Sequence, residues 1–153
     1  MDKSKPLPAA PGYHVMKGTA TYEGKEFPIA WGLFLPPSYF AGNQPFPLIC
    51  TLHNVVSDIG GSDGKPELVS EGFGLLMVKD IGSDSRHSGV MPKNPVNPRK
   101  TVLFIGLAPQ CPKDMGFERA PMNKVVVELI NEMGRLYRMD QDKVFLTGFS
   151  YGG

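Results

Sequence analysis

A serine between two glycines, Gly148-Phe-Ser150-Tyr-Gly152, is the pattern in this sequence with the clearest capacity for chemistry. It directly follows a β-branched and aromatic run, residues 144–147, which is predicted to be a buried strand. Glycines allow a sharp turn where a Cβ would clash, so Ser150 is expected to stand exposed above a sheet at the start of a helix. There its hydroxyl could act as a nucleophile, with helix N–H groups facing any negative charge that develops.

The sequence holds a second match to the same pattern, Gly60-Gly-Ser62-Asp-Gly64. No strand leads directly into it, and the glycines and aspartates around it are typical of a flexible surface turn. We therefore expect Ser150, rather than Ser62, to be the reactive serine, because strand, glycines and position agree only there.

Other residue types that could do chemistry lack the spacing that their chemistry needs. The aspartates form no calcium-binding loop and are better explained as solvated turn residues; they are Asp58, Asp63, Asp80 and Asp84. Cys50 and Cys111 fit neither a metal site nor a disulfide framework, and they are predicted to pack as small apolar groups at strand ends. His14 and His87 are most simply surface residues. We accordingly expect no metal ion and no cofactor.

The composition is that of an ordinary globular domain and does not suggest a nucleic-acid- or membrane-binding protein. Of 153 residues, 41% are hydrophobic and 20% are charged, which suits one domain with a sizeable core. Sixteen basic and 15 acidic side chains leave a formal charge of +1, so no attraction for nucleic acid or an anionic membrane is expected. No apolar run is long enough to span a bilayer, and no signal-peptide core follows the basic start, so a cytoplasmic location is the default expectation.

The hydrophobic pattern predicts strands and helices in alternation after an N-terminal hairpin. Residues 1–12 are expected to be a disordered lead-in, and residues 13–153 to belong to a single domain. The predicted strands span residues 13–22, 27–35, 48–52, 102–108 and 144–147, and the predicted helices span residues 66–79 and 121–138. Buried strands that alternate with helices indicate an α/β fold with a mainly parallel sheet.

The helix predicted over residues 121–138 has the clearest periodicity. Its apolar face is expected to contain Val125, Val126, Leu129, Ile130, Met133, Leu136 and Tyr137. The side chains expected to lie away from that face are Lys124, Glu128, Asn131, Glu132 and Arg135. Residues 139–142 are predicted to be the turn into the final strand.

Several stretches, in this order, resemble the α/β-hydrolase superfamily, and within it the carboxylesterase, phospholipase and polyhydroxybutyrate-depolymerase-like esterases. The matching pieces are Leu35–Tyr39, Pro47–His53, Glu71–Leu75, Ala108–Pro112 and Asp140–Gly153. The resemblance implies an α/β-hydrolase-type sheet with an N-terminal hairpin, of which this chain would be the N-terminal part, incomplete at its C-terminus. It implies a serine hydrolase acting on a small-molecule or acyl-ester substrate through an acyl-enzyme on Ser150, with Gly148 and Gly152 forming the elbow.

The resemblance also assigns the groups that would stabilise an oxyanion. The backbone N–H groups of Tyr151 and Val55 would be the two donors. His53 and Asn54 would shape the loop that carries Val55. Asn54 stands where the family has glycine, and asparagine adopts left-handed conformations more readily than other non-glycine residues.

The order of residues along the chain limits what the resemblance can assign. The triad of these hydrolases runs Ser, acid, His, whereas all three histidines here precede Ser150. The resemblance therefore implies that the acid and the base lie beyond residue 153 and that this chain alone is inactive. His53 as the base would need the order His, Asp, Ser of chymotrypsin-like proteases, whose all-β fold is at odds with the predicted helix 121–138.

Two kinds of alternative function stay open. Within enzymes, thioesterases and serine peptidases share this half of the fold with esterases. Outside enzymes, the chain could be an inactive truncated or split product that acts by pairing with another chain, or that self-associates, through an exposed sheet edge.

Overall fold

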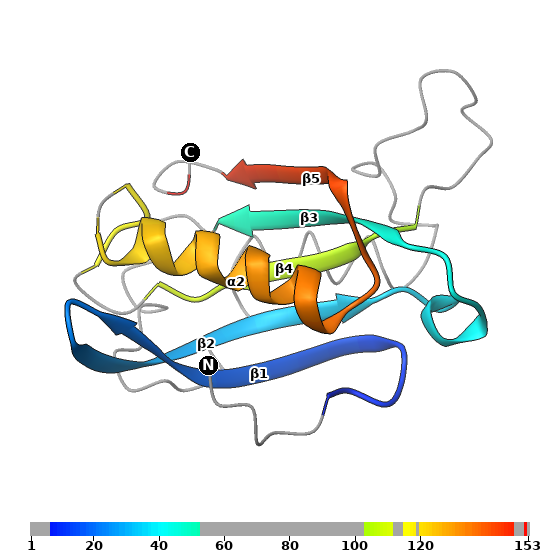
Figure 1. The fold of residues 1–153 in the computed structure, drawn as a ribbon, viewed down its shortest axis with the longest axis horizontal. Coiled ribbons are helices and arrows are strands. Elements are labelled where there is room, and N and C mark those ends of the chain that lie inside the picture. Colours follow the sequence, from blue (N-terminus) through cyan, green and yellow to red (C-terminus); the bar gives the residue numbers. More distant parts are fainter. Residues whose placement is uncertain (1–6, 53–102, 112–114, 119, 149–151, 153) are drawn as a thin grey trace.

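The described residues fold into one five-stranded sheet with an α-helix packed on one of its faces (Figure 1). The computed structural model describes residues 7–52, 103–111, 115–118, 120–148 and 152. The elements are β1 (Gly12–Tyr22), β2 (Lys25–Leu35), the short 3-10 helix η1 (Tyr39–Ala41), β3 (Phe46–Leu52), β4 (Ile105–Pro109), α2 (Met122–Leu136) and β5 (Met139–Gly148). The expected α/β fold class is confirmed, whereas the helix predicted over residues 66–79 lies outside the described residues. No helix in the described part is long and apolar enough to cross a membrane.

The N-terminal hairpin forms where the sequence predicts it. β1 and β2 pair antiparallel along their whole length, beginning with Gly12 opposite Leu35. Glu23 and Gly24 form the two-residue turn with φ angles of 50° and 76°. Both angles are positive, as a type I′ turn requires, and this turn matches the twist of the two strands. β2 ends at Leu35 because the prolines that follow, 36 and 37, have no N–H to donate to the ladder.

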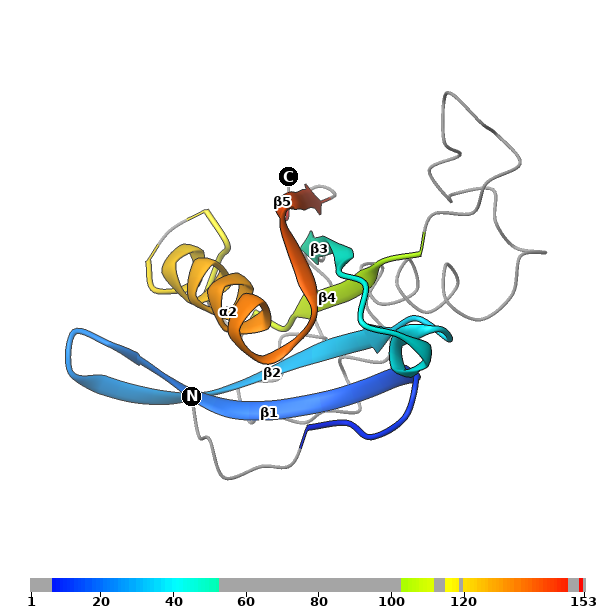
Figure 2. The same cartoon turned by 45° about the vertical axis from the view of Figure 1, so that its right-hand side comes forward.

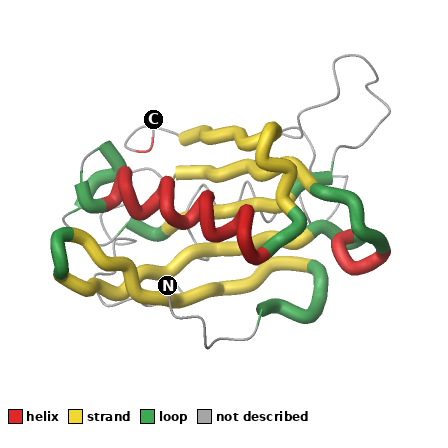
Figure 3. Tube along the Cα trace, viewed as in Figure 1, coloured by secondary structure: helices red, strands yellow, loops and turns green. Residues whose placement is uncertain are grey.

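The sheet combines an antiparallel and a parallel part in the order β1-β2-β4-β3-β5 (Figure 1), and its strands are the yellow segments of the tube in Figure 3. β2 pairs antiparallel with β4, whereas β3 lies between β4 and β5 and is parallel to both. Parallel neighbours need a crossover connection, and α2 supplies it by linking β4 to β5 across β3. The carboxyl ends of β3, β4 and β5 therefore lie at the same edge of the sheet.

The core lies between α2 and the face of the sheet that it covers (Figure 2). From α2 it contains Met122, Val125, Val126, Leu129 and Met133, and from the strands Leu33, Leu35, Leu48, Cys50, Ile105 and Leu107 among others. Burying each large apolar side chain stabilises the fold by roughly 1.5–3 kcal/mol. This burial fixes α2, and with it the connection into β5, against the middle of the sheet.

For two residues of α2 the observed burial is the reverse of what the helical periodicity predicts. Glu132, expected to face away from the core, is buried and forms an ion pair with Arg135 at 2.7 Å. The exposed Arg135 side chain extends back one turn to Glu132. Its guanidinium therefore balances the charge of the buried Glu132 carboxylate. Leu136, expected on the apolar face, is exposed because the helix ends there.

β5 is longer than the sequence predicts. The turn expected over residues 139–142 is instead the first part of the strand, and Met139 is the register partner of Phe46. The Phe46 N–H also donates a hydrogen bond to the carbonyl oxygen of Arg138 at 2.8 Å. β3 and β5 are thus joined from their first residues, which overrides the turn preference of the aspartates in that segment.

The apolar run 144–147, predicted to be a buried strand, is exposed in this structure. β5 forms one edge of the described sheet, and its residues from Gln141 to Gly148 are all exposed. A continuous apolar run indicates a strand covered on both faces, and its exposure here agrees with the exposed sheet edge that was also considered from the sequence. In the described part of the chain no element lies beyond β5 in the sheet.

Tyr39 connects the segment after the hairpin to the connection between α2 and β5. Its hydroxyl accepts a hydrogen bond from the backbone N–H of Arg138 at 3.1 Å, and the Arg138 guanidinium lies 4.5 Å from the centre of its ring. The same ring packs against Phe46 and Tyr137, with centroids 5.7 Å and 6.4 Å away. Since Phe46 starts β3 and Arg138 precedes β5, Tyr39 holds the beginnings of both strands.

Candidate functional site

The strand register brings together the ends of the two strands that precede the predicted site residues in the sequence. Leu52, the last residue of β3, is the Cα partner of Gly148, the last residue of β5, and Thr51 is the partner of Thr147. The carboxyl ends of β3 and β5 therefore lie side by side. Crevices outside the carboxyl ends of parallel strands are where open α/β sheets bind their ligands.

Gly148 and Gly152 lie in direct contact at this edge. A Cβ built on Gly148 would collide with the carbonyl group of Gly152 and would lie 3.1 Å from its Cα atom. Gly152 is buried, whereas Gly148 is exposed at the strand end. The close backbone approach gives a steric reason for glycine at position 148, and it fits the elbow expected from the sequence.

The remaining predicted site residues lie outside the described residues. They are the nucleophile Ser150, the oxyanion donors Val55 and Tyr151, and the loop residues His53 and Asn54. Ser62, His87 and the four aspartates considered as cation ligands also lie outside the described part. For this site the structure gives the positions of β3 and β5, the strands that precede the predicted residues in the sequence.

His14 is placed far from this edge of the sheet. It lies on β1, four positions from β5 in the strand order, which corresponds to about 19 Å at the usual strand spacing. Its ring Nε2–H donates to the carbonyl oxygen of Ala10 at 2.9 Å. A histidine in this place cannot take a proton from a serine that follows β5.

The two cysteines are free and buried, as the sequence predicts. Burial raises the pKa of the Cys50 thiol to about 12, and burial together with the nearby Glu118 charge raises the pKa of the Cys111 thiol to about 12. The Cys111 thiol also donates a hydrogen bond to the carbonyl oxygen of Met115 at 3.1 Å. Because the thiolate is the reactive form, these raised pKa values disfavour either cysteine as a nucleophile at neutral pH.

Two buried polar residues near the strand ends were not singled out in the sequence. Thr51 lies in β3 one residue before its end, and Gln110 follows β4 directly. The backbone N–H of Gln110 donates to the carbonyl oxygen of Ala30 at 2.9 Å, which extends the contact between β4 and β2. Gln110 could have been noticed in the sequence, because it is a polar residue within an otherwise apolar segment.

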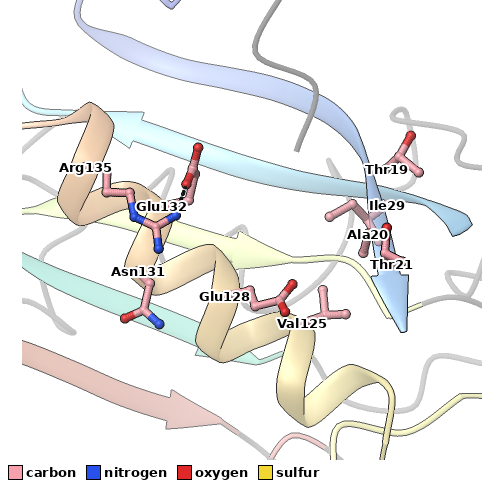
Figure 4. A pocket seen from close by; sticks show the side chains of 9 residues that line it. All are labelled: Thr19, Ala20, Thr21, Ile29, Val125, Glu128, Asn131, Glu132 and Arg135. Atoms are coloured by element: carbon pink, nitrogen blue, oxygen red, sulfur yellow. Dashed lines mark hydrogen bonds and ion pairs between the residues drawn. The ribbon is translucent and has the colours of Figure 1, made fainter. Parts of the chain in front are cut away.

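A cavity of about 320 Å³ lies elsewhere, between the hairpin and α2 (Figure 4). It is lined by Thr19, Ala20, Thr21, Ile29, Val125, Glu128, Asn131, Glu132 and Arg135. None of the residues predicted for the site is among them. In the described part of the chain, no three His, Cys, Asp or Glu side chains are grouped so that they could hold a metal ion.

Comparison with known proteins finds similarity at the level of the fold. No protein-family model and no curated protein matches the chain. A thermostable esterase matches with a TM-score of 0.59 and 19% identity, over 90% of this chain and 35% of its own. A ferulic acid esterase matches with a TM-score of 0.55 and 18% identity, over 92% of this chain and 52% of its own.

A third solved structure, an S-formylglutathione hydrolase from Agrobacterium tumefaciens, matches with a TM-score of 0.51 and 15% identity. The match covers 95% of this chain and 52% of that one. The chain thus spans between about a third and about half of the length of these three proteins. At these identities the likeness shows a shared, partial α/β fold.

A substitution at Gly148 tests whether the close approach of the two glycines matters. Gly148→Ala should lower the free energy of unfolding by about 1–3 kcal/mol, because its Cβ must displace the backbone of Gly152. Gly42→Ala is the matched control, since Gly42 has extended backbone and nothing within 4 Å of an added Cβ. Urea unfolding of both variants gives the comparison, and equal midpoints for the two would contradict the steric argument.

The buried thiols lead to a prediction about pH. Their pKa values rise from 9.0 to about 12 on folding, so the folded state keeps the proton that the unfolded state loses. The stability that this contributes is fully present below about pH 9 and is lost progressively between about pH 9 and 12. Near neutral pH the native thiols should react slowly with a thiol reagent and rapidly in concentrated urea; rapid reaction of the native chain would contradict their burial.

Proposed function

We propose that this chain carries the nucleophile of a serine hydrolase that cleaves carboxylic esters, with Ser150 as that nucleophile. The observation that supports this most directly is the contact between Gly148 and Gly152 at the end of β5. The two glycines bracket Ser150 in the sequence, and Gly148 lies beside the end of β3. A serine in a tight glycine turn at the carboxyl end of a parallel strand is the setting of the hydrolase nucleophile.

The proposed reaction proceeds through an acyl-enzyme. The Ser150 hydroxyl oxygen attacks the ester carbonyl carbon while a base takes its proton, and the carbonyl oxygen becomes an oxyanion. Collapse of the tetrahedral intermediate breaks the bond to the alcohol, which leaves with the proton. Water then attacks the acyl group and releases the acid, restoring the serine.

In this proposal the oxyanion is stabilised by the backbone N–H groups of Tyr151 and Val55. What supports this pairing of donors is that Leu52 and Gly148, the strand ends that precede Val55 and Tyr151 in the sequence, are register partners. Each such donor typically contributes about 3–4 kcal/mol to transition-state stabilisation. His53 and Asn54 set the path of the loop rather than acting on the proton.

The acid and the base are proposed to come from outside these 153 residues. Among the described residues, His14 is separated from β5 by the width of the sheet, and the two thiols are protonated at neutral pH. Without a base, a serine hydroxyl is a weak nucleophile. The chain alone is therefore expected to show little turnover.

The names of the similar structures bear on the substrate class. They include a thermostable esterase and a ferulic acid esterase, which favours an ester substrate. They also include an S-formylglutathione hydrolase, which keeps a thioesterase as the alternative within the same mechanism. A serine peptidase is less favoured because none of these three names indicates one.

A second candidate function is a non-catalytic one, in which the chain acts by pairing with another chain. The observation that favours it is the exposed apolar edge at β5. This candidate and the hydrolase differ in what they need from Ser150, because pairing through β5 does not involve its hydroxyl.

A fluorophosphonate probe tests the assignment of the nucleophile. In an enzyme that contains this sequence together with the acid and the base, the probe should modify Ser150, and Ser150→Ala should abolish labelling and lower kcat on the order of 10⁶-fold. Ser62→Ala is the matched control, because Ser62 has the same glycine pattern, and it should label normally. Modification of Ser62 would refute the assignment, and Ser150-dependent turnover by the 153 residues alone would refute the placement of the base.

A further inference from the structure

β5 lies beside β3 in the described sheet (Figure 1), and a bulge interrupts their pairing near its start. Phe46 is the register partner of Met139. The next pair is Leu48 with Val144, two residues later in β3 but five later in β5. The residues of β5 between the two pairs, 140–143, form the bulge and lie opposite a single proline of β3. A proline has no N–H for the ladder, which favours an interruption, and the length of the bulge decides where pairing resumes.

The residues after the bulge do not fix this register by themselves. Val144, Phe145 and Leu146 are all apolar, so a slip by one residue would exchange apolar side chains for apolar ones on both faces of the sheet. A slip of one residue would nevertheless move the end of β5 by about 3.3 Å along β3. The bulge is therefore the place where the pairing of Gly148 with Leu52 can be fixed.

Asp140 connects the beginning of the bulge to its end. Its Oδ1 accepts a hydrogen bond from the Asp142 backbone N–H at 3.2 Å, and its Oδ2 accepts one from the Lys143 ammonium at 2.7 Å. The hydrogen bond from Lys143 is the main reason why the pKa of the Asp140 carboxyl lies below its ordinary value, so this group is a carboxylate at neutral pH. One side chain thus holds the two residues that precede Val144 at a fixed distance from the start of the bulge.

Further contacts keep the bulge in place against β3 and α2. Before it, the Tyr39 hydroxyl accepts a hydrogen bond from the Arg138 N–H, and the Arg138 carbonyl oxygen accepts one from the Phe46 N–H at 2.8 Å. Within it, the Gln141 side chain lies against α2 at Gly134, where an added Cβ would come 3.4 Å from the side-chain amide nitrogen. The bulge therefore starts from a fixed point, and its own hydrogen bonds set where pairing with β3 resumes.

We propose that Asp140 is a positioning residue for ester hydrolysis: by fixing the length of the bulge, it sets Gly148 beside Leu52. These two residues end the strands that precede the proposed nucleophile Ser150 and the proposed oxyanion donor Val55 in the sequence. The inference rests on the proposed function, because it gives Asp140 a part in that reaction. A misplacement of about 1 Å can lower a rate on the order of 10²-fold, and a slip of one residue is larger than that.

Disulfide trapping reports this register independently of turnover. In an enzyme that contains this sequence together with the acid and the base, Ile49→Cys and Phe145→Cys should cross-link rapidly on mild oxidation, because these positions are register partners. In Asp140→Ala the end of the bulge is no longer held, so the bulge can shorten by one residue. That slip places Val144 opposite Ile49, and the cross-link should shift to the combination of Ile49→Cys with Val144→Cys.

Kinetics of the same enzyme test the effect on the reaction. Asp140→Ala should lower kcat on the order of 10- to 100-fold with a smaller change in KM, because the misplaced groups act on the transition state. The urea midpoint should change little, since an ion pair whose Lys143 side chain is 60% exposed contributes little to stability. Asp140→Asn keeps an acceptor for the Asp142 N–H and should restore part of kcat and of the wild-type cross-link. Asp142→Asn is the matched control: it removes a carboxylate from the same bulge, keeps the backbone N–H, and should leave both unchanged.

Two results would overturn the proposal. One is the wild-type cross-linking pattern in Asp140→Ala, which would mean that the register does not depend on this side chain. The other is a shifted pattern with an unchanged kcat, which would mean that the register does not matter for the reaction. A wild-type enzyme without Ser150-dependent turnover would overturn the proposed function and with it the role of Asp140 in catalysis, whereas the cross-linking pattern would still decide whether Asp140 fixes the register.

Discussion

The parallel pairing of β3 with β5 is the constraint on which the rest of the structure depends. It sets the end of β3 beside the end of β5, and both predicted halves of the site follow from these two ends. Tyr39 fixes the other end of the same pair, since its ring packs on Phe46 and its hydroxyl accepts a hydrogen bond from Arg138. Tyr39 thus helps to fix the positions of both strands, and with them the strand ends that precede the predicted site residues. A change at either end of the pair would move Gly148 relative to Leu52.

The fold could be predicted from the sequence wherever periodicity and turn chemistry agreed. The hairpin follows from its Glu-Gly turn and the prolines after it, and α2 follows from a regular apolar stripe. Predictions failed where the environment of a residue is not decided by the periodicity or turn preference of its own segment. Glu132 looks solvent-exposed by position, yet it is buried with Arg135 as its ion-pair partner. Residues 139–142 look like a turn, yet pairing with β3 draws them into β5.

The motif predicts a site around Ser150, which lies outside the described residues, so its geometry stays a prediction. The structure adds a steric reason for glycine at position 148, and that reason depends on Gly152. The apolar run 144–147 by itself indicates a strand covered on both faces, whereas an exposed sheet edge was also considered from the sequence, and the structure shows this run exposed at the edge of the described sheet.

The register of β3 with β5 is tested most directly by disulfide trapping across the two strands. Thr51 and Thr147 are Cα partners, and replacing both by cysteine places the two thiols within the reach of a disulfide, whereas the native cysteines are buried. The account predicts rapid formation of this disulfide on mild oxidation, and little for Thr51→Cys combined with Phe145→Cys, which is offset by two residues. Rapid formation in the offset pair, with none between positions 51 and 147, would contradict the placement of the turn after Gly148 beside the loop after β3.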